Sequence, residues 1–186
     1  MLLTEDQKFF LPILRETGWL RVSQVLPLLR IREPGKQAHQ AAAMLRRLCY
    51  TGQAVVVDST VCLPDLRTAP PDPDRLLALD VLLALRPRQL LQLSARNPLY
   101  ALCFLIQRRE AERLDHFAFL RVPPGREGAV CQILQAEPVP YLFLLALHTP
   151  EQHSLIRITR EHFFVLSQGS SLRFFRGKGG DNQQYR

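Results

Sequence analysis

The sequence predicts an α+β protein with a helical N-terminal part and a mixed-sheet C-terminal part, and three observations lead to this prediction. Apolar side chains over residues 1–50 recur at helical spacing. A proline-rich break follows at "DLRTAPPDPD", residues 65–74, where proline disfavours both helix and central strand. Beyond residue 87, short apolar runs bounded by turn residues are typical of strands.

Composition and charge limit the class of protein. A chain of 186 residues with 47% hydrophobic residues is expected to fold. Its longest apolar runs are far shorter than the roughly 20 residues of a membrane span, and its N-terminus lacks the basic start and cleavage site of an export signal. We therefore expect a cytoplasmic protein that makes no membrane contact. The net charge of +7 is compatible with nucleic acid as a partner but does not require it.

The cysteines and histidines indicate neither disulfides nor a metal centre. The four cysteines stand singly, without a C-x-x-C pair, which is typical of reduced thiols. Structural zinc sites draw their ligands from close pairs, whereas only His148 and His153 lie near each other in the sequence. We therefore expect no metal and no cofactor.

Two helices are predicted at the start of the chain. Thr4 and Gln7 form a capping-box pattern for a first helix that ends at Gly18. Pro12 is expected to kink this helix, because it removes one backbone hydrogen bond. Trp19 follows and is expected in the core, before a short second helix, "QVLPLLR".

A third helix begins near residue 35 or 36 and ends at Gly52, and "AVVVD" and "TVCLP" then form a hairpin around a tight turn. Helical spacing gives it an apolar inner face, formed by Ala38, Ala41, Leu45 and Leu48. The outer face is polar and basic, and carries Lys36, Gln37, Gln40, Ala43, Arg47 and Tyr50.

The order of three helices and a hairpin is that of a winged helix-turn-helix, which we assign to residues 1–66. In that fold the third helix enters the major groove and the hairpin lies beside the phosphate backbone. Arginine and lysine neutralise phosphates, glutamine suits adenine and arginine suits guanine. We therefore expect duplex DNA as the partner, bound by Lys36, Gln37, Gln40, Arg46 and Arg47. The hairpin near residues 58–60 should lie beside the backbone, although Asp58 is unfavourable next to phosphate, and winged helices also serve as docking modules for proteins.

The second half is predicted to be a mixed α/β domain over residues 75–176, preceded by a linker over 67–74 and followed by a flexible basic tail over 177–186. Asp72 and Pro73 start a helix that is apolar nearly all round and therefore covered on both sides. Three strands, a helix, a strand, a helix and two strands follow, which predicts a mixed sheet. These segments are "RQLLQLSA", "LYALCFLI", "LDHFAFLRV", "GREGAVCQILQAE", "YLFLLAL", "TPEQHSLIR", "HFFVLS" and "SLRFFRG".

This order resembles the core of restriction-endonuclease-like folds, but the catalytic residues of such nucleases are missing. Those enzymes place an acid on one central strand and an acid-x-Lys on the next, to hold Mg²⁺ beside the phosphate. Here "LYALCFLI" has no acid, "LDHFAFLRV" offers Asp115 alone, and the chain has three lysines, Lys8, Lys36 and Lys178. No G-x-S-x-G or phosphate-loop motif is present. We therefore expect no enzyme, and interpret the charged stretch "QRREAERLDH" as a solvated loop.

Three features together carry a family resemblance: the helix and hairpin "AAAMLRRLCYTGQAVVV", the proline-rich hinge, and "SARNPLYALCFLI" with "LDHFAFLRV". In these the chain resembles an uncharacterised winged-helix family of bacterial conjugative and integrative elements, distantly similar to plasmid replication-relaxation proteins. The resemblance implies a DNA-associated role in the replication, transfer or transcriptional regulation of a mobile element. The C-terminal domain, which resembles a nuclease core without its catalytic residues, is expected to be a docking or homodimerisation platform. The alternatives are a protein-interaction adaptor on a winged-helix scaffold and a divalent-metal nuclease.

Overall fold

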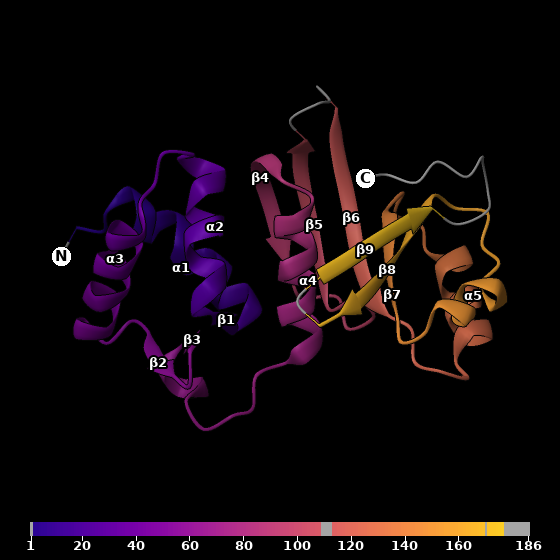
Figure 1. Ribbon diagram of the computed structural model, residues 1–186, viewed down its shortest axis with the longest axis horizontal. Helices are drawn as coiled ribbons and strands as arrows, with labels where there is room; N and C mark the ends of the chain where they lie inside the picture. Colours follow the sequence, from indigo (N-terminus) through magenta and orange to yellow (C-terminus); the bar gives the residue numbers. More distant parts are fainter. Residues whose placement is uncertain (1, 109–112, 170, 177–186) are drawn as a thin grey trace.

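The computed structural model describes residues 2–108, 113–169 and 171–176, which form an α+β protein with a three-stranded and a six-stranded sheet (Figure 1). The first three helices and the small sheet lie on one side of the molecule, and the large sheet lies on the other. Helix α4 (Pro73–Ala84) lies between them, against the large sheet. No helix in these ranges is long and apolar enough to cross a bilayer.

The N-terminal part contains three helices and three short strands. They are α1 (Glu5–Thr17), β1 (Trp19–Arg21), α2 (Val22–Arg32), α3 (Ala38–Tyr50), β2 (Val55–Val57) and β3 (Thr60–Cys62). Strand β3 is central, and pairs antiparallel with both β1 and β2. The predicted order of three helices and a hairpin is confirmed, and Trp19 is buried as expected. Strand β1 is an addition, because three residues are too few to show a strand period in the sequence.

Both ends of α1 follow from local chemistry. The Thr4 N–H donates to Gln7 Oε1 at 2.9 Å, and the Gln7 N–H donates to Thr4 Oγ1 at 3.3 Å, which confirms the capping box. Gly18 has a φ of +76°, a value that favours glycine, and its N–H donates to the Leu14 carbonyl at 2.8 Å. Pro12 lies inside the helix.

The hairpin between β2 and β3 turns on two residues with positive φ, Asp58 at 45° and Ser59 at 64°. A two-residue turn with both values positive matches the right-handed twist of the flanking strands. The Val22 N–H donates to the Ser59 carbonyl at 2.8 Å, so this turn is attached to the start of α2.

The large sheet is mixed, and its strands lie side by side in sequence order, β4-β5-β6-β7-β8-β9. Strands β6, β7 and β8 are parallel to one another, and the other neighbouring pairs are antiparallel. The elements are β4 (Pro87–Ser94), β5 (Leu102–Arg108), β6 (Leu114–Arg121), α5 (Glu127–Ala136), β7 (Leu142–Leu147), the 3-10 helix η2 (Pro150–Leu155), β8 (His162–Gln168) and β9 (Ser171–Arg176). A further 3-10 turn, η1 (Pro64–Leu66), precedes the connection to α4.

The predicted order of elements in this half is confirmed, with one difference of type. The segment "TPEQHSLIR" forms the short 3-10 helix η2 instead of an α-helix. The start of α4 is as predicted, since the Asp72 carboxylate accepts from the N–H groups of Asp74 and Arg75. Part of the predicted charged loop (109–112) and the predicted basic tail (177–186) lie outside the described residues.

Each face of the large sheet has its own apolar layer, because side chains alternate along a strand. One face carries Phe104, Phe117 and Val165, under α4 and the N-terminal helices. The opposite face carries Phe143 and Phe164, which pack with Val130 and Leu134 of α5 and with apolar residues near η2. Both faces of the central strands are therefore buried.

The first apolar layer continues from the N-terminal helices into the large sheet. Phe10 and Leu28 belong to the same buried cluster as Leu79 and Phe104. Polar contacts reinforce it, since the Gln24 amide donates to the Leu76 carbonyl and the Asp80 carboxylate at 2.9 and 2.6 Å. Figure 1 shows α2 between α3 and α4. The small and the large sheet thus share one core.

Candidate functional site

Helix α3 presents a polar face to solvent that contains no acid. Its exposed side chains are Ala38, His39, Gln40, Ala42, Ala43, Arg46, Arg47 and Tyr50. Its buried side chains are Ala41, Met44, Leu45 and Leu48. The prediction of the inner face is therefore confirmed for Ala41, Leu45 and Leu48. It is wrong for Ala38, which begins the helix before the helix reaches the core.

Lys36 does not belong to the exposed face, and its predicted place on the outer surface is wrong. The residue is 6% exposed, and its ammonium lies 2.6 Å from the Glu33 carboxylate and 3.0 Å from the Asp6 carboxylate. These two hydrogen bonds raise the pKa of Lys36. A lysine already paired with two acids has little charge to offer to a phosphate.

Gln37 and Gln40 are exposed, but each uses part of its side chain within the protein. Gln40 Oε1 accepts from the Gln37 N–H at 2.9 Å, and Gln37 Nε2 donates to the Gly35 carbonyl at 3.0 Å. Bidentate recognition of adenine needs both the oxygen and the nitrogen of a glutamine amide. The bond from Gln37 occupies one of the two lone pairs of Gln40 Oε1, so an adenine would have to share this oxygen with the start of α3.

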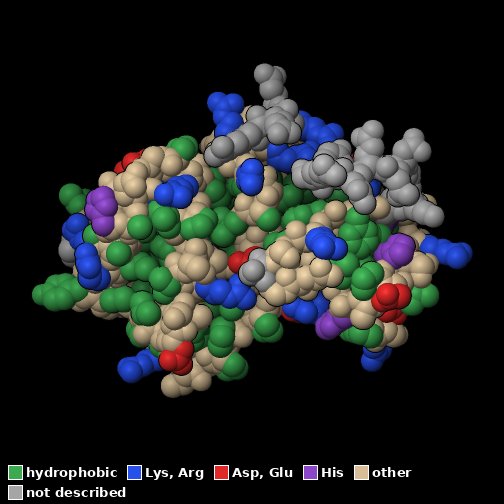
Figure 2. All heavy atoms as spheres, viewed as in Figure 1, with side chains coloured by type: hydrophobic (Ala, Val, Ile, Leu, Met, Phe, Trp, Pro, Cys, Tyr) green, Lys and Arg blue, Asp and Glu red, His purple; other side chains and the backbone are tan. Residues whose placement is uncertain are grey.

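Arg46 and Arg47 are the two predicted contacts whose charge is available. Both are exposed, and neither guanidinium has an ion pair or hydrogen bond with any residue that the structure describes. Spacings of three, four and seven residues place them on one side of the helix with His39, Ala43 and Tyr50. Tyr50 is 92% exposed. Figure 2 shows basic and histidine side chains gathered at the end of the molecule that α3 forms.

The hairpin next to α3 contributes an acid and no cation. Strand β2 contacts α3, and residues 55–62 contain Asp58 but no lysine or arginine. Asp58 and Ser59 are exposed at the turn, and Val56 is 47% exposed. Of the hairpin and α3, only α3 therefore carries positive charge that could attract phosphate.

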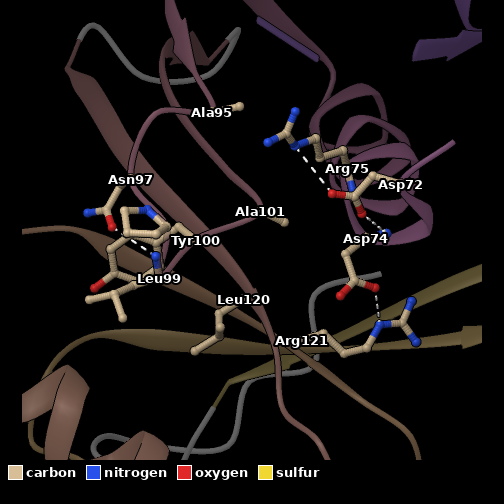
Figure 3. Close-up of a pocket in the computed structure, with 11 residues that line it drawn as sticks. Asp72, Asp74, Arg75, Ala95, Asn97, Leu99, Tyr100, Ala101, Leu120 and Arg121 are labelled. Atoms are coloured by element: carbon tan, nitrogen blue, oxygen red, sulfur yellow. Dashed lines mark hydrogen bonds and ion pairs between the residues drawn. The ribbon is translucent and has the colours of Figure 1, made fainter. Parts of the chain in front are cut away.

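A pocket of about 300 Å³ lies between the start of α4, the loop before β5 and the end of β6 (Figure 3). Its charged side chains are already paired with one another, Asp74 with Arg121 and Asp72 with Arg75. Asp72 also accepts the two N–H groups that begin α4. The sequence does not point to this pocket, because its walls come from segments that are distant in the chain. The remaining lining is Ala95, Asn97, Pro98, Leu99, Tyr100, Ala101 and Leu120.

The acids of the pocket and of the central strands do not converge on one cation position. Asp115 of β6 has 3% of its side chain exposed, and pairs with both Arg108 and Arg113. In the described part of the chain, no three His, Cys, Asp or Glu side chains are grouped to hold a metal ion. A carboxylate that faces two arginines is a structural ion pair.

Cys103 and Tyr141 belong to the apolar layer on the α5 side of the sheet, which also contains Tyr100 of the pocket lining. Burial raises the pKa of Cys103 to about 11 and the pKa of Tyr141 to about 12. A thiol with such a pKa stays protonated at neutral pH and is a poor nucleophile.

The exposed face of α3 and the pocket at α4 are thus the two candidate sites, and of these two, only α3 offers charged side chains without a partner among the described residues. No family model, curated protein or solved structure matches this chain.

Proposed function

We propose that residues 1–66 form a winged helix-turn-helix that binds duplex DNA through the exposed face of α3. The observation that carries this proposal is the pair of exposed, unpaired arginines, Arg46 and Arg47, on an α3 face without acids. Phosphate contacts by arginine supply most of the affinity of such a surface. Lys36 is no longer among the proposed contacts, since Glu33 and Asp6 neutralise it.

The arrangement of elements supports the winged-helix part of the proposal. The hairpin of β2 and β3 follows α3 directly, and β1 completes a three-stranded sheet of order β1-β3-β2. Helix α3 has 13 residues, a length of about 20 Å that suits insertion into a major groove. The small side chains of Ala42 and Ala43 permit a close approach to the duplex, and Arg46 and Arg47 can reach guanine edges or phosphates.

For the C-terminal domain we propose a restriction-endonuclease-like core that serves a non-catalytic role. Six strands in sequence order, with β5 antiparallel to both of its neighbours, support this assignment. The paired state of Asp74 and Asp115 supports the absence of nuclease chemistry. A role in the replication, transfer or regulation of a mobile element remains the process that the family resemblance suggests.

The test is fluorescence anisotropy of a mixed-sequence duplex with the wild type and Arg46→Ala/Arg47→Ala. The matched control is Arg126→Ala/Arg157→Ala, which removes two exposed arginines whose side chains have no partner in the described ranges. We expect the α3 variant to bind more weakly than the control, with a less steep dependence on salt. Equal binding by the two variants, or no binding by the wild type at low salt, would remove the proposal.

The adaptor is the second candidate, and the acidic side chain at the hairpin turn is the observation that favours it. Asp58 lies where a winged helix would meet phosphate, and Tyr50 and Val56 are exposed nearby. The adaptor predicts that neither the wild type nor Asp58→Asn binds duplex DNA at low salt. The DNA proposal predicts that this substitution strengthens binding, because it removes a negative charge from the surface.

A further inference from the structure

A second exposed basic surface lies at the border of the large sheet. Strand β4 is the end strand, and its register against β5 shifts twice, so that Arg88 and Leu91 are extra residues in β4. Both are bulges, and both side chains are exposed. Bulges at a sheet edge turn a side chain away from the regular pleat, and here they turn one cation and one leucine outward.

The residue before β4 also has an unusual backbone. Arg86 has a φ of 49°, in the left-handed region that favours glycine because any Cβ atom is crowded there. It follows the cap residue of α4, a position where glycine is usual. Arg86 is exposed. The backbone therefore accepts strain at a position where it displays a guanidinium.

Among the residues that the structure describes, no acid pairs with the charges at this border. The sequence contains no Asp or Glu between Asp80 and Glu110. Neither the Arg86 nor the Arg88 side chain has an ion pair or hydrogen bond with another described residue. Gln89 and Gln92 are exposed on the same strand and add amide donors. We call this surface, formed by Arg86, Arg88, Gln89 and Gln92, the β4 edge.

We infer that the β4 edge is a second nucleic-acid contact, which binds the phosphate backbone. The guanidinium fork matches the oxygens of a phosphate, and glutamine amides add hydrogen bonds that do not depend on sequence. A protein strand is a poorer fit, because two bulges interrupt the row of N–H and C=O groups that an added strand would need. The inference rests on the proposed affinity for nucleic acid, but not on α3 as the surface.

The experiment measures the dissociation constant of a duplex of about three helical turns, at about 50 and about 200 mM salt. The test variant is Arg86→Gln/Arg88→Gln, and the control with the same charge change is Arg126→Gln/Arg157→Gln. A third variant, Arg86→Lys/Arg88→Lys, keeps the charge at the β4 edge. Circular dichroism checks that each variant is folded.

If Arg86 and Arg88 each contact a phosphate, Arg86→Gln/Arg88→Gln loses two phosphate contacts. The factor by which the dissociation constant rises between the two salt concentrations then becomes about 12-fold smaller than in the wild type. The control and the Arg→Lys variant should keep the wild-type factor. A test variant that behaves like the control overturns the inference. The inference is also overturned if the test variant differs from the wild type in molecular mass in solution but binds the duplex equally well. That result would mean that a second copy of the chain contacts the β4 edge.

The two proposals fail in different ways. Loss of binding in Arg46→Ala/Arg47→Ala alone would leave α3 as the DNA surface and reject the β4 edge. Loss in Arg86→Gln/Arg88→Gln alone would retain the β4 edge and reject α3. If both surfaces contact nucleic acid, each double variant weakens binding more than the control does.

Discussion

The Lys36 ammonium lies 3.0 Å from the Asp6 carboxylate, and this ion pair joins the connection that precedes α3 to the first turn of α1. Glu33 completes the contact on one side at 2.6 Å, and Arg32 contacts Asp6 at 2.7 Å on the other. Two cations and two acids thus join α1, the end of α2 and the connection to α3 at one corner of the protein. The role of this cluster is to position α3.

Replacement of Lys36 tests this role. We expect Lys36→Ala to lower the melting temperature by a few degrees, because Asp6 loses a partner in a largely buried place. DNA affinity, measured well below the melting temperature, should stay near that of the wild type. Lys8→Ala is the control, since Lys8 pairs with Glu5 on the open surface and should contribute little to stability. An unchanged melting temperature with weakened DNA binding would show instead that Lys36 reaches the duplex.

The same cluster predicts a loss of stability in acid. Burial raises the pKa of the Asp6 carboxyl, but hydrogen bonds from Lys36 and Arg32 outweigh burial, so the pKa lies below its ordinary value. A lowered pKa stabilises the folded state above the unfolded value of about 3.9, and this stabilisation disappears as the pH falls through the folded value. Urea unfolding should find Asp6→Asn less stable than the wild type at neutral pH, with a smaller difference near pH 2. A constant difference across this range would contradict the expectation.

His162 predicts a second pH dependence. Here the folded state favours the neutral form of the side chain, whereas at Asp6 it favours the charged form. The residue is 5% exposed, and its Nε2 has no hydrogen-bond partner among the described residues. Burial lowers the pKa of His162, so the folded state resists a proton that the unfolded state accepts below about pH 6.5. Stability should therefore fall as the pH drops from about 7 to about 5, by at most about 1.4 kcal/mol per pH unit for this group.

The measurement is urea unfolding of the wild type and His162→Phe over that pH range. Phenylalanine keeps a ring against Phe164, whose centroid lies 4.9 Å from that of His162, but cannot be protonated. The variant should lose part of the slope of stability against pH. His116→Phe is a useful comparison, because burial also lowers the pKa of His116. An identical slope in the wild type and His162→Phe would show that His162 takes up its proton without cost.

The shared core predicts that the protein unfolds in one step. Trp19 is the single tryptophan and lies in β1, so its fluorescence reports on the N-terminal part and on its contact with Leu76 of α4. We expect the fluorescence and the far-ultraviolet circular dichroism to change at the same urea concentration. Gln24→Ala should shift both signals together and lower stability by about 1–3 kcal/mol, because it removes the hydrogen bonds to the Leu76 carbonyl and to Asp80, which keeps Arg21 as a partner. Two separate transitions would show that residues 1–66 fold independently.

Much of the local structure could be read from the sequence, because it is encoded by neighbours in the chain. The Thr4 and Gln7 cap, the turn at Asp58 and Ser59, and the apolar face of Leu45 and Leu48 all depend on contacts within a few residues. The order of strands in the second half followed in the same way from apolar runs and turn residues.

The predictions that failed depend on partners that are distant in sequence. Lys36 looked like an exposed cation because helical spacing gives no information about Asp6, which is 30 residues earlier and belongs to another helix. The pocket at Asp72 and Arg121 escaped notice for the same reason. The bulges at Arg88 and Leu91 are set by the register with β5, which no single strand reveals.

The contact between α2 and α4 has a consequence for how the chain can be divided. The proline-rich segment looks like a natural boundary at which to divide the chain. One buried cluster nevertheless contains residues from both sides of this segment, among them Leu28 and Leu79. A fragment that ends at residue 66 would leave the apolar side of α2 in water. Recombination that replaced one half by that of an unrelated protein would have to recreate the apolar contact between α2 and α4. The two halves are therefore expected to be inherited together.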